Sequence, residues 1–209
     1  MREAVMWNYQ YYLLGLDGTL TDSGEGIMNS IRHSLDKFGI TEYEETTLRK
    51  FIGPPLADCF QKYFDLSPEE ARKGIDYYRE YYTDGGMFEN EVYHGVKELV
   101  EGLYAKVKTL IVATSKPELF AEQMLEHFDL SKYFACIAWA SMDETRVHKE
   151  DFISYALQKY KGIDHKKAVM ICDRTHATMG CKTNGMDTIG VLYGFWKREE
   201  SEEDGAERG

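Results

Sequence analysis

The pattern of hydrophobic positions along the chain follows two different rhythms. Short runs of adjacent apolar residues, such as Tyr11–Leu16, are typical of buried strands, whereas the spacing of Ile27, Ile31, Leu35 and Phe38 is typical of a helix. On this basis we expect strands at 11–16, 109–113, 134–138, 168–171 and 188–192. We expect helices at 27–38, 46–51, 56–64, 68–82, 96–104, 117–128, 149–160 and 176–184.

The order of these elements predicts the fold class. Between the first strand and residue 86 the pattern is helical only, and from residue 87 onward strands and helices alternate. Alternation of this kind predicts an α/β fold, a Rossmann-like parallel sheet with helices on both faces. We therefore expect a core made of residues 1–22 and 87–209, with residues 23–86 inserted as a small all-helical cap.

Composition and charge narrow the classes of function. The 209 residues carry a formal net charge of -11, which argues against nucleic acid as a partner because phosphate backbones attract basic surfaces. No segment is apolar over the length that a membrane span needs, so we expect a cytoplasmic protein without a membrane partner. The four cysteines form no CxxC pair and are expected to be buried free thiols, and the six histidines show no metal-ligand spacing.

Polar residues follow the predicted strands at the edge where ligands bind in parallel sheets. Asp17, Gly18 and Thr19 follow the first strand, Thr114, Ser115 and Lys116 the second, and Asp173 the fourth, while Lys149 opens a helix. Carboxylates suit a hard divalent cation, and hydroxyls, backbone N–H groups and an ammonium suit phosphate. Taken singly, each has an ordinary explanation as a turn, a helix cap or a solvated lysine.

These segments together resemble the four motifs of haloacid-dehalogenase (HAD) phosphatases. The resemblance rests on four stretches in order along the chain: YYLLGLDGTLTDSGEGI, LIVATSKP, RVHKEDFISYAL and VMICDRTHATMGCKTNGM. The segment FIGPPL, residues 51–56, resembles the cap of the branch that includes phosphoglycolate phosphatases and 5′-nucleotidase-like enzymes. The family pattern of the first motif is DxDGT.

The resemblance implies roles for particular residues. Asp17 corresponds to the aspartate that protonates the leaving group and then activates water. Gly18, Thr114, Ser115 and Lys149 correspond to the groups that hold the phosphoryl group. Asp17 and Asp173 correspond to positions at an Mg²⁺ site. In the cap, we expect Arg49, Lys50, Gly53 and Arg79 to meet an anionic substrate, although solvated helix surface is the ordinary role for the three charged residues.

The sequence departs from the family pattern at the position of the nucleophile. Gly15 stands where the pattern has the aspartate that attacks phosphorus, and Ala177 stands where the fourth motif has a second acidic residue. Cys172 replaces a glycine before Asp173, and Trp139 and Trp196 stand where small residues are usual. Loss of a covalent nucleophile removes several powers of ten in rate, and Mg²⁺ binds weakly without enough oxygen ligands.

Three interpretations of function remain. The first is a phosphatase for a small phosphorylated molecule, a nucleoside monophosphate or phosphoglycolate, with impaired or lost activity and a weakened Mg²⁺ site. The second is a non-catalytic protein that binds a phosphate ligand, and the third is a structural remnant. Similar proteins continue beyond the region where this chain ends, which would leave a sheet edge uncovered, so we expect a monomer or a homodimer.

Overall fold

The computed structural model describes residues 8–140, 149–160, 162–173, 181 and 184–195. The chain divides into two compact units. One comprises residues 1–21 and 92–209, and the other comprises residues 22–91. Two short paired strands, β2 (Thr21–Asp22) and β3 (Glu91–Val92), carry the chain out of the first unit and back into it.

The first unit is built on a five-stranded sheet with the order β5-β4-β1-β6-β7. Neighbouring strands of this sheet pair in parallel, with Leu14 of the central strand opposite Val112 on one side and Ile171 on the other. The strands are β1 (Tyr11–Leu14), β4 (Thr109–Pro117), β5 (Phe134–Ala140), β6 (Ala168–Cys172) and β7 (Asp187–Gly190). The α/β class predicted from the alternating pattern is confirmed.

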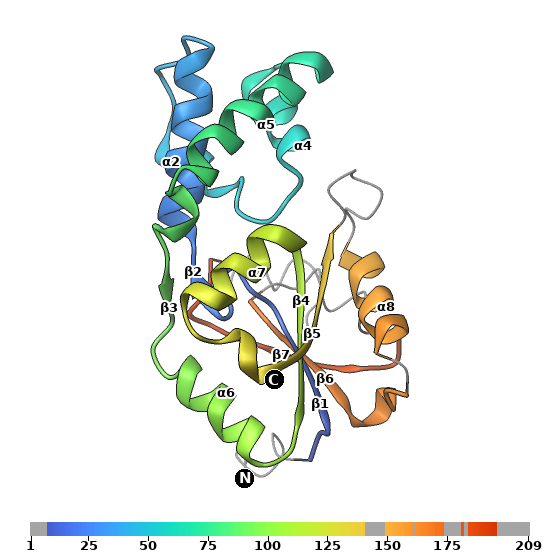
Figure 1. Ribbon diagram of the computed structural model, residues 1–209. Helices are drawn as coiled ribbons and strands as arrows, with labels where there is room; N and C mark the ends of the chain where they lie inside the picture. The colour runs from blue at the N-terminus through green and yellow to red at the C-terminus, as the bar shows by residue number, and fades with distance from the viewer. Residues whose placement is uncertain (1–7, 141–148, 161, 174–180, 182–183, 196–209) are drawn as a thin grey trace. The chain divides into compact units, whose positions relative to one another are not determined.

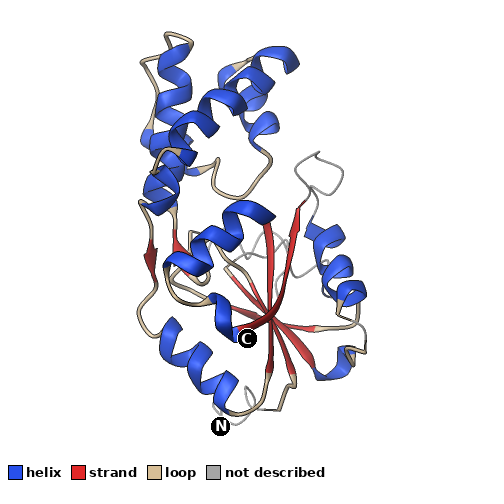
Figure 2. Ribbon diagram, viewed as in Figure 1, coloured by secondary structure: helices blue, strands red, loops and turns tan. Residues whose placement is uncertain are grey.

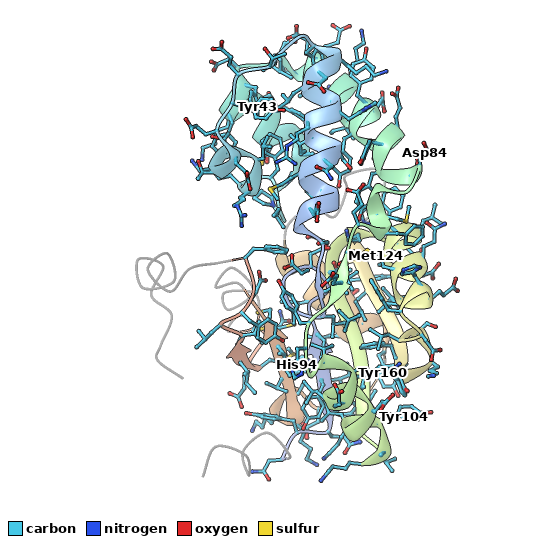
Figure 3. All side chains as sticks on the ribbon, turned by 90° about the vertical axis from the view of Figure 1, so that its left-hand side faces the viewer. Tyr43, Asp84, His94, Tyr104, Met124 and Tyr160 are labelled. Carbon is cyan, nitrogen blue, oxygen red and sulfur yellow. The ribbon has the colours of Figure 1, made fainter. Side chains whose placement is uncertain are left out.

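Helices cover both faces of this sheet, as Figures 1 and 2 show. One face packs against α6 (Val96–Ala105) and α7 (Glu118–His127), where the fully buried Met124 lies (labelled in Figure 3). The other face packs against α8 (Lys149–Lys159). Successive β1 residues alternate between the two cores, with Leu14 in one and Leu13 in the other, because strand side chains point to opposite faces. Two short 3₁₀ helices, η2 (Ser131–Tyr133) and η3 (His165–Lys167), complete the connections.

The second unit is helical apart from the strand residues at its ends. Its elements are α2 (Gly24–Lys37), α3 (Glu45–Arg49), α4 (Leu56–Phe64), α5 (Pro68–Thr83) and the 3₁₀ helix η1 (Gly86–Phe88). Ser67 caps α5 through a reciprocal bond pair with Glu70, and Pro68 opens the helix, as the sequence predicted. The four tyrosines of α5 pack within this unit, and Tyr78 stacks on Tyr82 with ring centroids 5.1 Å apart.

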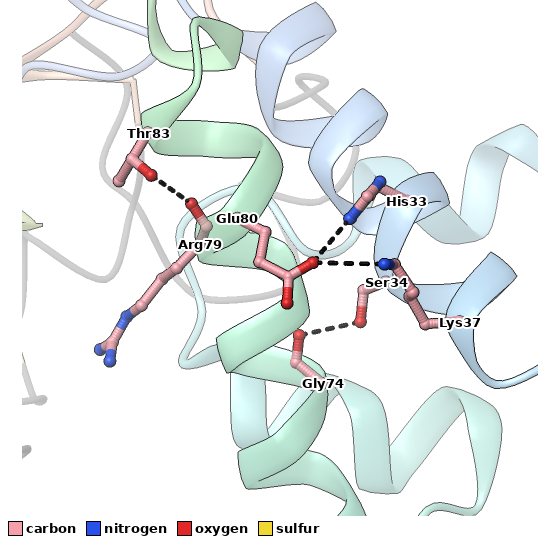
Figure 4. Close-up of polar contacts among 7 residues, drawn as sticks. All are labelled: His33, Ser34, Lys37, Gly74, Arg79, Glu80 and Thr83. Atoms are coloured by element: carbon pink, nitrogen blue, oxygen red, sulfur yellow. Dashed lines mark hydrogen bonds and ion pairs between the residues drawn. The ribbon is translucent and has the colours of Figure 1, made fainter.

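Polar contacts tie α2 to α5 (Figure 4). The buried Ser34 hydroxyl donates to the carbonyl oxygen of Gly74 at 2.8 Å, and the Glu80 carboxylate contacts the His33 ring and the Lys37 ammonium at 3.2 and 3.5 Å. These ion pairs are largely exposed, so they contribute little to stability compared with the buried apolar contacts. The hydrogen bonds at Glu80, that from His33 foremost, hold the pKa of this carboxyl below its usual range.

Several element boundaries differ from the prediction. β1 ends at Leu14 rather than Leu16, because Leu16 already accepts the turn hydrogen bond from Leu20 at 2.9 Å. β4 continues to Pro117, where we had expected a helix to begin. β2 and β3 escaped prediction because two residues show no periodicity. The helix expected at 176–184 falls mostly outside the described residues.

The cysteine prediction is confirmed for three of the four residues. All four thiols are free, and Cys59, Cys172 and Cys181 are buried, but Cys136 is only half-buried. Burial raises the pKa of the Cys181 thiol to about 11. Among the helices of the described residues, none is long and apolar enough to cross a membrane.

Candidate active site

The topology brings the predicted site residues to one edge of the sheet. β4, β1 and β6 are neighbours and parallel, so their carboxyl ends lie side by side. Thr114 and Lys116 lie at the end of β4, Asp17 follows β1, and Asp173 follows β6. Residues separated by more than 150 positions in the chain are thereby placed together, as a site at the carboxyl edge of a parallel sheet requires.

The turn after β1 is held by backbone hydrogen bonds. The Gly15 amide donates to the Ile171 carbonyl oxygen at 2.9 Å, and the Gly18 amide donates to the Thr21 carbonyl oxygen at 2.8 Å. Gly18 has φ +76°, the left-handed region that favours glycine, and a side chain there would collide with the Asp173 carboxylate. The turn therefore needs glycine at position 18 both for its conformation and for its contact with Asp173.

A buried ion pair joins the end of β4 to this turn. The Lys116 ammonium lies 3.1 Å from Asp17 Oδ1, and their side chains are only 5% and 17% exposed. The hydroxyl oxygen of Thr114 accepts the Lys116 backbone N–H at 3.0 Å. Lys116 has no role in the resemblance to the family motifs, in which the hydroxyls of the two preceding residues are the groups that bind phosphate. Its burial against Asp17 makes it a further candidate residue of the site.

Gly15 lies within the same cluster. Its φ lies outside the left-handed region, so the backbone conformation does not itself require glycine. A Cβ added there would lie 2.7 Å from Thr19 Oγ1 and 3.7 Å from Cys172 Cβ. The Thr19 hydroxyl would therefore crowd the Cβ of an aspartate at position 15. That hydroxyl oxygen also accepts the Asp173 backbone N–H at 3.1 Å.

The segment after β7 completes the surroundings of Asp173. The Phe195 backbone N–H donates to Asp173 Oδ2 at 3.3 Å, and the Tyr193 hydroxyl donates to the Thr19 carbonyl oxygen at 3.0 Å. Burial, followed by the negative charge of Asp173, raises the pKa of the Tyr193 phenol. Neither residue could be predicted from the sequence, because nothing in the local pattern links residues 193–195 to the first motif.

The remaining predicted residues are placed less completely. Ser115 is half-buried on β4. Lys149 is the first residue of α8, and the structure does not describe the Lys149 side chain. The same holds for the side chain of Trp139, and Ala177 and Trp196 lie outside the described residues altogether. They stay predictions.

The four predicted cap residues all lie in the second unit. Arg49 pairs with Glu45 on the surface of α3 at 3.3 Å, and the Lys50 ammonium lies 5.3 Å from the centre of the Tyr63 ring. The Arg79 guanidinium extends away from the Glu80 cluster (Figure 4), and Gly53 has φ +98°. A substrate contact for any of them stays a prediction.

The described side chains do not by themselves form a complete magnesium site. Mg²⁺ requires about six oxygen ligands in octahedral geometry. Asp17 is engaged with Lys116 and Asp173 with the Phe195 amide, and position 15 has no side chain. Across the part of the chain that the structure describes, no group of three or more His, Cys, Asp or Glu side chains is placed to hold a metal ion.

Comparison with known proteins agrees with this geometry. Residues 12–191 match the family model for haloacid dehalogenase-like hydrolases. The chain is 40% identical to a 5′-nucleotidase of Pseudomonas aeruginosa over 96% of its own length and 90% of that protein's. It is 23% identical to a phosphoglycolate phosphatase of Vibrio parahaemolyticus, over 86% of its length and 82% of that protein's. The crystal structure of a predicted phosphatase from Clostridium acetobutylicum superimposes with a TM-score of 0.88 and 45% identity, covering 95% of this chain and 91% of that one.

Proposed function

Because the chain belongs to the haloacid dehalogenase-like hydrolase family, we propose that it binds small phosphate monoesters and hydrolyses them slowly. The observation that carries this proposal is the meeting of Asp17, Thr114 and Lys116 at the carboxyl ends of two adjacent strands. A carboxylate, a hydroxyl and an ammonium in a largely buried cluster are suited to holding a phosphoryl group and moving a proton beside it.

We propose nucleoside monophosphates as the substrate class. The 5′-nucleotidase relative is 40% identical over nearly the whole chain, whereas the phosphoglycolate phosphatase relative is 23% identical. The fold is common to both relatives, so it supports neither class over the other. The difference in sequence identity is therefore the basis for choosing nucleoside monophosphates over phosphoglycolate.

The chain's own residues can perform a direct hydrolysis. Thr114 Oγ1 accepts a backbone N–H, so its hydroxyl hydrogen can point to a phosphoryl oxygen. Asp17 can accept a proton from water as the water oxygen bonds to phosphorus. The ester P–O bond then breaks, Asp17 passes that proton to the leaving oxygen, and an alcohol and inorganic phosphate result.

The missing carboxylate at position 15 makes this route slow. Without it the reaction has no protein nucleophile, and water must attack phosphorus in a single step. Removal of a nucleophile costs roughly three to six powers of ten in rate in well-studied enzymes. We expect turnover well below that of relatives that carry the aspartate.

The test is phosphate release from a panel of nucleoside monophosphates and phosphoglycolate, measured with and without Mg²⁺. We expect slow release from the nucleoside monophosphates, abolished in Asp17→Asn. The matched control is Asp187→Asn, which alters a carboxylate at the opposite edge of the sheet. Release from phosphoglycolate alone would contradict the substrate class, and equal release by the wild type and Asp17→Asn would contradict the role of Asp17.

A second candidate is a protein that binds phosphate esters without turning them over. It is favoured because the Thr114 and Lys116 cluster is in place while a side chain at position 15 is absent. Loss of a carboxylate also removes a like charge from beside an anionic ligand. This candidate predicts that nucleoside monophosphates raise the melting temperature although no phosphate is released over a day. A melting temperature unmoved by millimolar ligand would contradict both candidates.

A further inference from the structure

We propose that residues Tyr193–Phe195, which follow β7, form a clamp that positions Asp173 against the turn after β1. The functional part of this inference rests on the proposed function, since it treats Asp173 as part of a phosphate-ester site. The structural part stands on the contacts of the clamp alone. Each of its three residues contacts the first or the fourth motif in a different way.

Tyr193 anchors the clamp to the first motif. Its hydroxyl donates to the Thr19 carbonyl oxygen at 3.0 Å, and its ring lies 4.7 Å from the ring of Tyr93 at an interplanar angle of 52°. The Tyr93 amide in turn donates to the Leu20 carbonyl oxygen at 3.1 Å. The tyrosine is thus held at both its polar and its apolar end by residues at or beside the turn.

Phe195 reaches the carboxylate itself. Its backbone N–H donates to Asp173 Oδ2 at 3.3 Å, so one carboxylate oxygen is fixed by the main chain. Its ring is close to the turn as well, because a Cβ added to Gly18 would lie 2.9 Å from Phe195 Cδ2. The clamp therefore touches both the carboxylate and the glycine of the turn that faces it.

Gly194 allows this close approach. A Cβ added there would overlap Asp173 Cβ and the Gly18 carbonyl oxygen, so no side chain fits. Its φ lies outside the left-handed region, which means that the backbone conformation alone would accept alanine. Glycine is required at position 194 because of the contacts with Asp173 and Gly18, and substitution there tests these two contacts.

The clamp and the turn together fix Asp173 from several sides. Its backbone N–H donates to Thr19 Oγ1 at 3.1 Å, while its carboxylate accepts from the clamp. Small displacements of a site carboxylate are costly, since a misplacement of about 1 Å can lower a rate roughly 100-fold. We therefore assign residues 193–195 a positioning role at the site and no direct contact with substrate.

The experiment compares Gly194→Ala with Gly190→Ala in the full chain. Gly190 lies four residues earlier on β7, outside the left-handed region and with open space where a Cβ would stand, so it is a matched control. Amide hydrogen exchange at Asp173 and Gly18 is measured first. We expect exchange at Asp173 to rise by about tenfold or more in Gly194→Ala and to stay unchanged in Gly190→Ala.

Affinity for adenosine monophosphate is measured next by calorimetry. We expect Gly194→Ala to weaken binding by about fivefold or more while Gly190→Ala binds as the wild type does. If Gly194→Ala does not fold, Tyr193→Phe takes its place, with Tyr104→Phe as the control, because Tyr104 is an exposed residue of α6. Tyr193→Phe removes only the hydroxyl that donates to Thr19.

The two measurements separate the failure of the clamp from the failure of the proposed function. Equal exchange at Asp173 in the clamp variant and its control would overturn the clamp, whether or not the wild type binds the nucleotide. Faster exchange with unchanged affinity would overturn the positioning role. Absence of nucleotide binding by the wild type would count against the proposed function, and the exchange rates would still decide whether the clamp holds Asp173.

Discussion

The ends of β1 and β4 lie side by side at the carboxyl edge of the sheet, but they differ in the side chains that they carry. At the end of β4 the buried ammonium of Lys116 and the hydroxyl of Thr114 are both present and engaged. At the end of β1 the turn keeps its hydrogen bonds and its left-handed glycine, yet position 15 has no side chain. One end carries groups that suit an anion, and the other carries no side chain at position 15.

The turn after β1 therefore keeps its shape without any side chain at position 15. The turn is held by main-chain hydrogen bonds, by Gly18 and by the contacts of Thr19, none of which involves a side chain at position 15. Thr19 Oγ1 lies 2.7 Å from the place where the Cβ of such a side chain would stand. The architecture of the turn therefore needs no side chain at position 15.

The largest effect is expected from restoring the end of β1. The double variant Gly15→Asp/Ala177→Asp should raise the rate of phosphate release from a nucleoside monophosphate by about 1,000-fold or more, since it returns the nucleophile and a second carboxylate. Thr19 must rotate to make room, so a small loss of stability is expected as well.

The matched control for this variant is Gly15→Asn/Ala177→Asp. Asparagine has nearly the shape of aspartate but is not a carboxylate nucleophile. Steady-state phosphate release is measured for both variants. A gain that is equal in the two, or absent from the aspartate variant, would show that position 15 is not the site of the missing chemistry.

The next effect concerns the end of β4. Lys116→Met should lower the free energy of unfolding by about 3 kcal/mol, because it takes the partner of Asp17 Oδ1 out of a largely buried ion pair. Chemical denaturation measures the change. Lys132→Met is the control: its ion pair with Asp129 is exposed, and stability should not change measurably. Similar stability changes in both variants would contradict the importance given to the buried pair.

A smaller effect is expected from Thr114→Val. The substitution keeps the shape but leaves the buried Lys116 backbone N–H without the acceptor it now has, at a cost of about 1–2 kcal/mol. Binding of a nucleoside monophosphate should weaken by about tenfold as the hydroxyl is lost. Thr109→Val, at the other end of the same strand, should leave affinity unchanged. Unchanged affinity in Thr114→Val would remove this hydroxyl from the site.

The smallest effect is expected at the amino ends of the strands, opposite the edge that carries the candidate site. Burial, with the hydrogen bond to Asp187, raises the pKa of Tyr9 to about 12 from its ordinary value of 10.0. The protonated phenol therefore stabilises the folded chain fully below pH 10, and this contribution is lost as the pH rises from 10 to 12. Tyr9→Phe should flatten the fall in stability over this window without changing affinity for phosphate esters. If stability depends on pH in the same way in Tyr9→Phe and the wild type, the role given to the raised pKa of Tyr9 would be contradicted.

Much of the fold could be predicted because the central strands β1, β4 and β6 are largely buried on both faces. Runs such as Leu110–Ala113 stand out from the helical spacing around them, and the residues that follow them fall at one edge once the strands are parallel. Motif order therefore predicted that Asp17, Thr114 and Asp173 meet. The positions of strand ends were less accurate, because a strand gives way to a turn through hydrogen bonds that apolar spacing does not encode.

Other parts of the site could not be predicted from the sequence. The Lys116 side chain could have pointed to solvent, and only the fold shows that it is buried against Asp17. The contacts of Tyr193 and Phe195 join segments more than 170 and 20 residues apart, respectively, through a hydroxyl and a backbone amide. A backbone N–H is common to nearly every residue, so sequence alone cannot tell which one reaches a carboxylate.

The contrast between the two strand ends is tested most directly by phosphorus NMR of the wild-type chain mixed with an equal amount of adenosine monophosphate. An intact β4 end and an incomplete β1 end predict a shifted ligand resonance, which reports binding, followed by slow growth of the inorganic phosphate signal over many hours. A ligand resonance that stays at its free position, or conversion to inorganic phosphate within seconds, would contradict the account.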